Sequence, residues 1–158
     1  MNELSQSAQK VQTALQAMGL PSQVVELPGS TRTAVEAAQA VGCQVGQIVK
    51  SLIFRGVETD RPILVIASGP NRVDETRLAE LANEPVKKAD ADFVRASTGF
   101  AIGGVPPVGL SGPIMTFIDE DLLQYEAVWA AAGTPHAVFQ LNPAVLGRIT
   151  GGTLASIK

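Results

Sequence analysis

The chain has 158 residues, of which 46% are hydrophobic and 17% charged, so it can bury a real core and we expect one domain over residues 1–158. Its formal net charge of −3 argues against a broad surface that wraps nucleic acid, and we expect no DNA partner. One cysteine excludes an internal disulfide, and with a single histidine it is too few for a Cys/His zinc site, so we expect no metal.

The apolar runs are all shorter than a membrane span, and the polar N-terminus lacks the basic and apolar regions of a signal peptide. We therefore expect a soluble, cytoplasmic protein with no membrane partner. The charge leaves room for a local basic patch, whose candidates are Arg72, Arg77, Lys87, Lys88 and Arg95. A solvated surface is the simpler interpretation of these side chains.

The N-terminal part of the chain predicts two helices and a short strand. Apolar residues recur at helical spacing over residues 4–18, so we expect a helix there with one face in the core. A short strand is predicted over residues 23–27, and a second helix over residues 34–41. Either Thr31 or Thr33 is expected to be the N-cap of the second helix.

The three residues before the second helix are candidate substrate-binding residues. Thr31, Arg32 and Thr33 precede a helix start, which offers free backbone N–H groups to anions. Capping alone explains at least one of the two threonines.

The stretch Ile48–Phe54 is rich in β-branched and aromatic residues and predicts a strand with one lysine inside it. Because side chains alternate along a strand, Lys50 shares the more apolar row with Ile48, Leu52 and Phe54. Burial disfavours the ammonium unless a partner or a bound anion compensates. Lys50 is therefore a candidate functional residue, although a lysine at a sheet rim with its ammonium in water is the simpler interpretation.

The remaining elements alternate between short strands and short helices. Residues 62–67 form an apolar run that predicts a strand antiparallel to the lysine strand. Further strands are predicted over residues 86–89, 113–118, 127–131, 137–141 and 154–157. Further helices are predicted from Asp74 to Ala82, from Asp90 or Asp92 to Thr98, and after Asn142, while Asp119 caps one short turn. Seven or eight strands with four or five helices indicate a compact mixed α/β (α+β) domain.

The loop from Gly103 to Gly109 is stiff and poor in side chains. Gly103 and Gly104 allow the backbone to approach a ligand closely, and Pro106-Pro107 fix the direction of the chain. The backbone of this loop is the second candidate element of a site.

Common catalytic motifs are absent from the sequence. It has no phosphate-binding loop, no dinucleotide-binding glycine motif and no Gly-x-Ser-x-Gly elbow, so we expect no cofactor. Cys43 and His136 are candidates for a nucleophile pair. However, Cys43 directly follows a helix end, and a small residue packed against the fold is the simpler interpretation of it. The remaining candidate is a cofactor-free pocket built from Lys50 and the backbone of residues 103–109.

These motifs, in this order, resemble the prolyl-tRNA editing (YbaK-like) family. The resemblance is carried by Ile48–Phe54, by Thr98-Gly99-Phe100 and by the loop Gly103–Gly109, and it extends from Thr31 to Gly152. That family includes the editing insertion of bacterial prolyl-tRNA synthetases and its free-standing relatives. The resemblance implies a barrel-like mixed sheet of about seven strands surrounded by short helices. It also implies hydrolysis of the ester of mischarged tRNA.

The resemblance also implies which residues form the site. Lys50 matches the family's lysine and Gly103–Pro107 matches its Gly-x-x-x-Pro loop, so Lys50, Gly103 and Gly104 are the expected catalytic residues. The expected substrate-binding residues are Thr31, Arg32 and Thr33 from the helix start, Val105, Pro106, Pro107 and Gly109 from the loop, and His136. His136 is a counterpart, by position only, of a functional histidine in the synthetase insertion. The expected partners are the aminoacylated 3′ end of tRNA and prolyl-tRNA synthetase. Without synthetase domains, this copy is expected to act in trans.

Two other functions are left open by the sequence. One is a catalytically silent module that binds tRNA ends or a synthetase. The other is an enzyme whose lysine forms a Schiff base with a small carbonyl substrate, which requires a depressed lysine pKa. The amino acid that is removed is not identified by the sequence.

Overall fold

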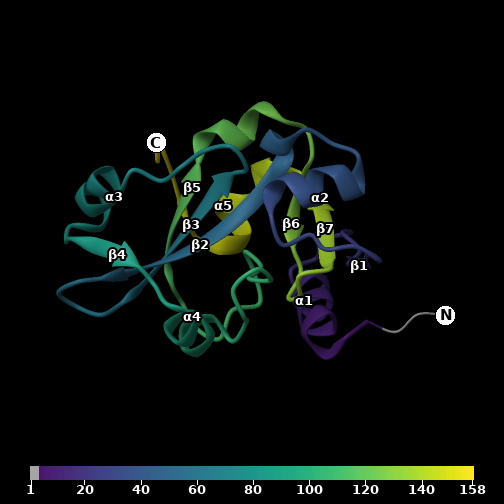
Figure 1. The fold of residues 1–158 in the computed structure, drawn as a ribbon, viewed down its shortest axis with the longest axis horizontal. Coiled ribbons are helices and arrows are strands. Elements are labelled where there is room, and N and C mark those ends of the chain that lie inside the picture. The colour runs from purple at the N-terminus through teal and green to yellow at the C-terminus, as the bar shows by residue number, and fades with distance from the viewer. Residues whose placement is uncertain (1–3) are drawn as a thin grey trace.

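The computed structural model describes residues 4–158 as five α-helices and eight strands (Figure 1). The helices are α1 (Gln6–Ala17), α2 (Ala34–Val41), α3 (Glu75–Ala82), α4 (Ala91–Thr98) and α5 (Leu146–Thr150). The strands are β1 (Val25–Glu26), β2 (Ile48–Gly56), β3 (Pro62–Ser68), β4 (Val86–Lys88), β5 (Met115–Asp119), β6 (Val128–Ala131), β7 (Ala137–Leu141) and β8 (Thr153–Ala155). Within the described range, no helix combines the length and apolar character needed to cross a membrane.

All eight strands belong to one mixed sheet. Their order is β1-β7-β6-β2-β3-β5-β8, and β4 pairs with β2 beside this path. The pairs β2–β6, β3–β5 and β5–β8 are parallel, and the others are antiparallel. The predicted mixed α/β fold is confirmed, with a sheet that is open, because β1 and β8 end its path without pairing to each other.

Strand β3 is buried on both faces, which explains its apolar sequence. Leu64 and Ile66 belong to a large core that includes residues of α1, β5 and β7. Ile63, Val65 and Ala67 belong to a second core with Phe54 and with side chains of α3. Because side chains alternate along a strand, a central strand between two cores must be apolar throughout.

Helix α2 covers one end of β2. Ala37 and Ala38 pack against Ile48 in a small third cluster of buried residues. Thr33 is the N-cap, since its side chain accepts the N–H of Glu36, and Gly42 ends the helix in the left-handed conformation. Figure 1 shows α2 near β6 and β7, while α3 and β4 lie toward the other end of β2.

Several element ends differ from the prediction for local reasons. The strand expected over residues 23–27 shortens to β1, because the N–H of Val24 donates to Gln12 Oε1 at 2.7 Å instead of to a strand. Asn142 caps a 3₁₀ turn over Pro143–Val145, and α5 begins only after that turn. Asp90, and not Asp92, caps α4.

Candidate active site

Strand β2 is paired along one edge and partly open along the other. On the first edge, β3 pairs with it continuously from Val49 to Arg55. On the second edge, β6 pairs only with Ile48 and Val49, and β4 pairs only with Phe54–Gly56. The middle of β2 therefore borders a gap in the sheet.

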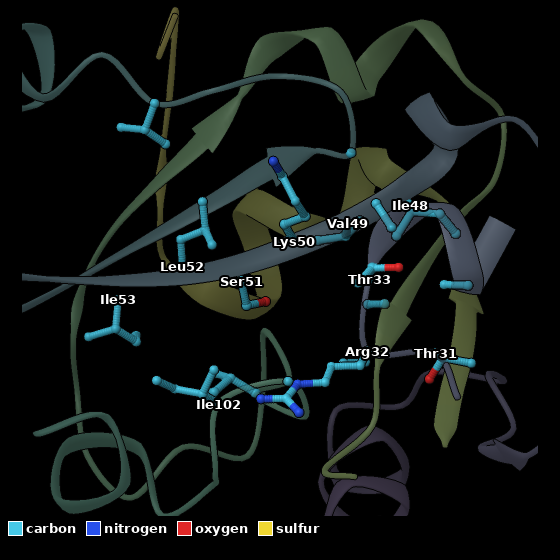
Figure 2. Close-up of a pocket in the computed structure, with 18 of the residues that line it drawn as sticks. Thr31, Arg32, Thr33, Ile48, Val49, Lys50, Ser51, Leu52, Ile53 and Ile102 are labelled. Carbon is cyan, nitrogen blue, oxygen red and sulfur yellow. The ribbon is translucent and has the colours of Figure 1, made fainter. Parts of the chain in front are cut away.

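A cavity of about 940 Å³ lies along this gap. Its volume is in the range of pockets that hold small organic ligands. The cavity is lined by every residue from Ile48 to Phe54, by the chain around the start of α2, by the turn after β3 and by residues near the ends of β4 and β6. Figure 2 shows Lys50 and Leu52 on one side of β2, and Ser51 and Ile53 on the side of Arg32 and Ile102.

Lys50 is half-buried in this cavity, in the row of the strand that its spacing predicted. Its Nζ donates a hydrogen bond to the main-chain oxygen of Asn71 at 2.7 Å. Burial lowers the pKa of Lys50, the nearby Arg72 lowers it further, and Asp119 acts in the opposite direction. The Lys50 ammonium therefore lies at the cavity and loses its proton more readily than it would in water.

The partner of Lys50 is fixed by a network that the sequence did not reveal. The Asn71 side chain donates to Asp119 Oδ2 and to Asp121 Oδ2, at 2.8 Å each. Asp119 is 1% exposed and also accepts the N–H of Ser68 at 3.0 Å. The sequence predicted Asp119 only as a cap, which it is, because its other oxygen accepts the N–H of Asp121. The one available signal was a carboxylate at the end of an apolar strand.

The three residues before α2 lie at the same cavity. Thr31, Arg32 and Thr33 all line it. Thr31 is buried and its Oγ1 donates to the carbonyl of Pro135 at 3.1 Å, so it anchors the loop. Arg32 is exposed and lies toward Ile102 in Figure 2, where its guanidinium is available to a ligand.

The glycine pair of the loop has two different roles in the fold. Gly103 lines the cavity with φ +93°, and a Cβ there would lie 3.1 Å from Arg32 Cγ. Gly104 is engaged on both sides, because its N–H donates to the Ala101 carbonyl and its own carbonyl accepts the N–H of Gly133. The expected catalytic role of both glycines stays a prediction, but the N–H of Gly104 is already used inside the loop.

The structure brings together only part of the predicted site. Besides Lys50, Gly103 and the three residues before α2, Val105 lines the cavity, as do two basic-patch candidates, Arg72 and Lys88. Pro106 and Gly104 are buried and are not among the lining residues, and Pro107 and Gly109 line a separate cavity of about 200 Å³.

His136 lies outside the main cavity. It is exposed, and its Nδ1 is 2.9 Å from the carbonyl oxygen of Gly29. Its carbonyl accepts the N–H of Leu27. In this position it supports the segment that leads to Thr31, and its predicted role in substrate binding stays untested.

One feature of the cavity was missed altogether by the sequence. The hydroxyl of Ser51 is buried and makes no hydrogen bond to any described residue. A serine in a strand carries no signal of this kind, because its partners depend on how distant strands pair.

Within residues 4–158, no group of three or more His, Cys, Asp or Glu side chains is placed to hold a metal ion.

The model of one family, described as "Aminoacyl-tRNA editing domain", matches residues 29–149. The chain belongs to the aminoacyl-tRNA editing domain family. This editing domain is an aminoacyl-tRNA hydrolase: it acts on mischarged tRNA by hydrolytic deacylation. The predicted family is thereby confirmed.

Individual relatives agree with this family. A solved structure described as "Crystal structure of a putative trans-editing enzyme for prolyl tRNA synthetase" is 52% identical, with a TM-score of 0.92 over 99% of each chain. The "Putative Cys-tRNA(Pro)/Cys-tRNA(Cys) deacylase EbsC" of Enterococcus faecalis is 29% identical over 79% of this chain and 76% of its own. A proline–tRNA ligase of a Thermoanaerobacter species is 30% identical over 66% of this chain, which spans 18% of that ligase.

Proposed function

We propose that the chain hydrolyses the ester of tRNA(Pro) that carries a small non-cognate amino acid, and that it acts in trans. The proposal is supported by the descriptions of its relatives, which name prolyl-tRNA synthetase and tRNA(Pro). The observation that carries it is the cavity at the open edge of β2, where a half-buried ammonium and unpaired backbone face the same space.

The charge of the cavity suits a nucleic-acid end. Its charged lining residues are Arg32, Lys50, Arg72, Lys88 and Glu75, so basic side chains outnumber acidic ones. The whole chain is acidic, with a net charge of −3. Local positive potential on an acidic protein attracts phosphates to one place without general nucleic-acid binding. We infer that the terminal nucleotide of tRNA enters here.

The reaction needs positioning more than a strong base. Water attacks the carbonyl carbon of the aminoacyl ester, the bond from that carbon to the ribose 3′-oxygen breaks, and the proton of the water passes to this oxygen. An aminoacyl ester is already activated, so holding it and stabilising the oxyanion supplies much of the rate. We propose that Lys50 holds the carbonyl or the neighbouring phosphate, and that the ribose 2′-hydroxyl, which is adjacent to the leaving oxygen, relays the proton.

The test is a deacylation panel. Purified protein is incubated with tRNA(Pro) charged with alanine, serine, cysteine, threonine or proline, and free amino acid is measured against the spontaneous rate. We expect release of one or more of the small non-cognate amino acids and retention of proline. Binding of charged tRNA without release of any amino acid would instead support a silent binding module.

A second experiment addresses prolyl-tRNA synthetase as a partner. Deacylation of the same substrates is measured with and without added synthetase, at tRNA concentrations below saturation. A partnership predicts that the synthetase changes the apparent KM or traps a ternary complex. Identical kinetics and no co-migration would remove the synthetase from the proposal and leave the tRNA end as the only partner.

A further inference from the structure

The open edge of β2 is centred on one residue. The N–H of Ala89 donates to the carbonyl of Ile53, so the backbone groups of Ile53 point toward β4. Backbone groups of every second residue point the same way, and those of Ser51 therefore face the gap. On one side the ladder with β6 stops at Val49–Ala130, and on the other β4 reaches only to Phe54. Neither neighbouring strand pairs with Ser51.

The gap has the hydrogen-bonding pattern of one missing residue. In an antiparallel hydrogen-bonded pair, two residues exchange both of their N–H···O=C bonds. An aminoacyl ester carries the same two groups, an α-amino donor and a carbonyl acceptor, on either side of one Cα. It can therefore accept from the Ser51 N–H and donate to the Ser51 carbonyl, as a peptide does when it adds to a sheet edge.

This placement also decides where the side chain of the substrate lies. Residues that face each other across a ladder have their side chains on the same face of the sheet. On that face Ser51 is followed by Ile53 and preceded by Val49, both in the large apolar core. The Ser51 hydroxyl is buried and makes no hydrogen bond to any described residue. A buried hydroxyl of this kind gains most from a ligand that supplies one hydrogen bond.

We propose that the aminoacyl group of the substrate occupies the sheet position opposite Ser51, and that the Ser51 hydroxyl selects side chains bearing a hydroxyl or thiol over alanine. The inference rests on the proposed deacylase function and names its substrate class: esters of serine, threonine or cysteine. The Ser51 N–H, which holds the carbonyl oxygen, then also faces the oxyanion that forms during hydrolysis. Ser51 is thus a specificity-determining residue through its side chain and an oxyanion donor through its backbone.

The test compares seryl-tRNA(Pro) with alanyl-tRNA(Pro) as substrates of the wild type and Ser51→Ala. We expect the wild type to prefer the seryl ester in kcat/KM, and Ser51→Ala to reduce this preference about tenfold while alanyl hydrolysis changes less than threefold. Ser51→Thr keeps the hydroxyl and should keep the preference. Ser97→Ala, a half-buried serine outside the cavity, is the matched control.

A binding measurement tests the backbone part separately. The probe is 3′-seryl-amido-3′-deoxyadenosine, whose amide resists hydrolysis, added to ¹⁵N-labelled protein. We expect the amide of Ser51 to show one of the largest shifts and to become protected from solvent exchange, and both effects to persist in Ser51→Ala. An unchanged Ser51 amide at saturation would overturn the placement.

The outcomes separate this inference from the proposed function. If the wild type releases no amino acid from any ester, both fail. If it deacylates, but prefers the alanyl ester or loses both activities equally in Ser51→Ala, the inference fails and the deacylase stands. Removing a buried hydroxyl that has no protein partner should leave the melting temperature of Ser51→Ala unchanged or higher, so a lower one would indicate a structural role instead.

Discussion

The two edges of β2 show how one strand serves both stability and chemistry. Toward β3, seven consecutive residues are paired and the partner strand is buried from Ile63 to Ser68. Toward β4 and β6, the middle of the strand is unpaired and borders the cavity. Unpaired strand edges are a liability that proteins normally cover. We propose that this gap, beside a half-buried lysine, is part of the site, and the first predictions below compare the two edges.

The largest expected effect is on the open edge. Lys50→Met should lower single-turnover deacylation about a hundredfold to a thousandfold, as the loss of a group that stabilises the reacting centre does. Burial lowers the pKa of Lys50, so the charged form is disfavoured in the folded protein. That cost is present below the folded-state pKa and is relieved as pH rises toward the unfolded-state pKa. At neutral pH the melting temperature of Lys50→Met should therefore be unchanged or higher.

Lys88→Met is the matched control, since Lys88 also lines the cavity but is exposed. It should change the apparent KM a few-fold and leave the single-turnover rate nearly intact. Equal losses in both variants would mean that Lys50 contributes only general positive charge.

A substitution on the paired edge should lower stability and leave turnover per folded molecule unchanged. Ile63 lies opposite Phe54 and is fully buried in the core on the α3 side. Ile63→Ala should lower the free energy of unfolding by about 2–5 kcal/mol, because it removes apolar contacts and leaves a cavity. Denaturant unfolding measures this loss, and turnover per folded molecule should match the wild type. A large loss of turnover in the folded fraction would show that the two edges are coupled.

Gly103 and Gly104 allow the same comparison of stability and activity within one loop. A Cβ at Gly104 would lie 2.8 Å from backbone atoms of Gly133 and Thr134, so Gly104→Ala should cost about 1–3 kcal/mol of stability through overpacking. The three atoms nearest to a Cβ at Gly103 all belong to the flexible Arg32 side chain, so Gly103→Ala should cost about 1 kcal/mol and chiefly reduce deacylation. Thermal melting and turnover per folded molecule are measured together. The reverse pattern would place the loop's contribution at Gly104.

The smallest effect concerns the pH dependence. The positive charge of Arg72 lowers the pKa of Lys50, so removing it should raise that pKa. If the charged lysine is the active form, activity falls as pH rises through its pKa. The alkaline limb of the pH–rate profile should therefore move to higher pH in Arg72→Gln. A limb that stays in place or moves to lower pH would assign it to another group.

The sequence predicted what depends on local alternation and failed where distant strands decide. The apolar run of β3 and the row of Lys50 both follow from the two-residue period of a strand, and both are confirmed. The gap beside Ser51 depends on how far β4 and β6 extend along β2. That is a property of pairing between segments far apart in the chain, and no local pattern encodes it.

The polar network shows the same limit. Asp119 was recognised as a cap because capping is a local interaction. Asp119 also contacts Ser68, which is 51 positions away in the sequence, and Asn71, which is 48 positions away. Contacts over such separations are not encoded in any sequence motif. The ring contact of His136 with the Gly29 carbonyl likewise joins distant segments, and its predicted role in substrate binding stays a prediction.

The most direct test of the deacylase account is a single-turnover time course with seryl-tRNA(Pro) and prolyl-tRNA(Pro), using the wild type and Lys50→Met. The account predicts that the wild type releases free serine far above the spontaneous rate, that prolyl-tRNA(Pro) stays intact, and that Lys50→Met binds the charged tRNA but releases serine about a hundredfold to a thousandfold more slowly. Wild-type binding without release of any small amino acid, or full activity in Lys50→Met, would contradict it.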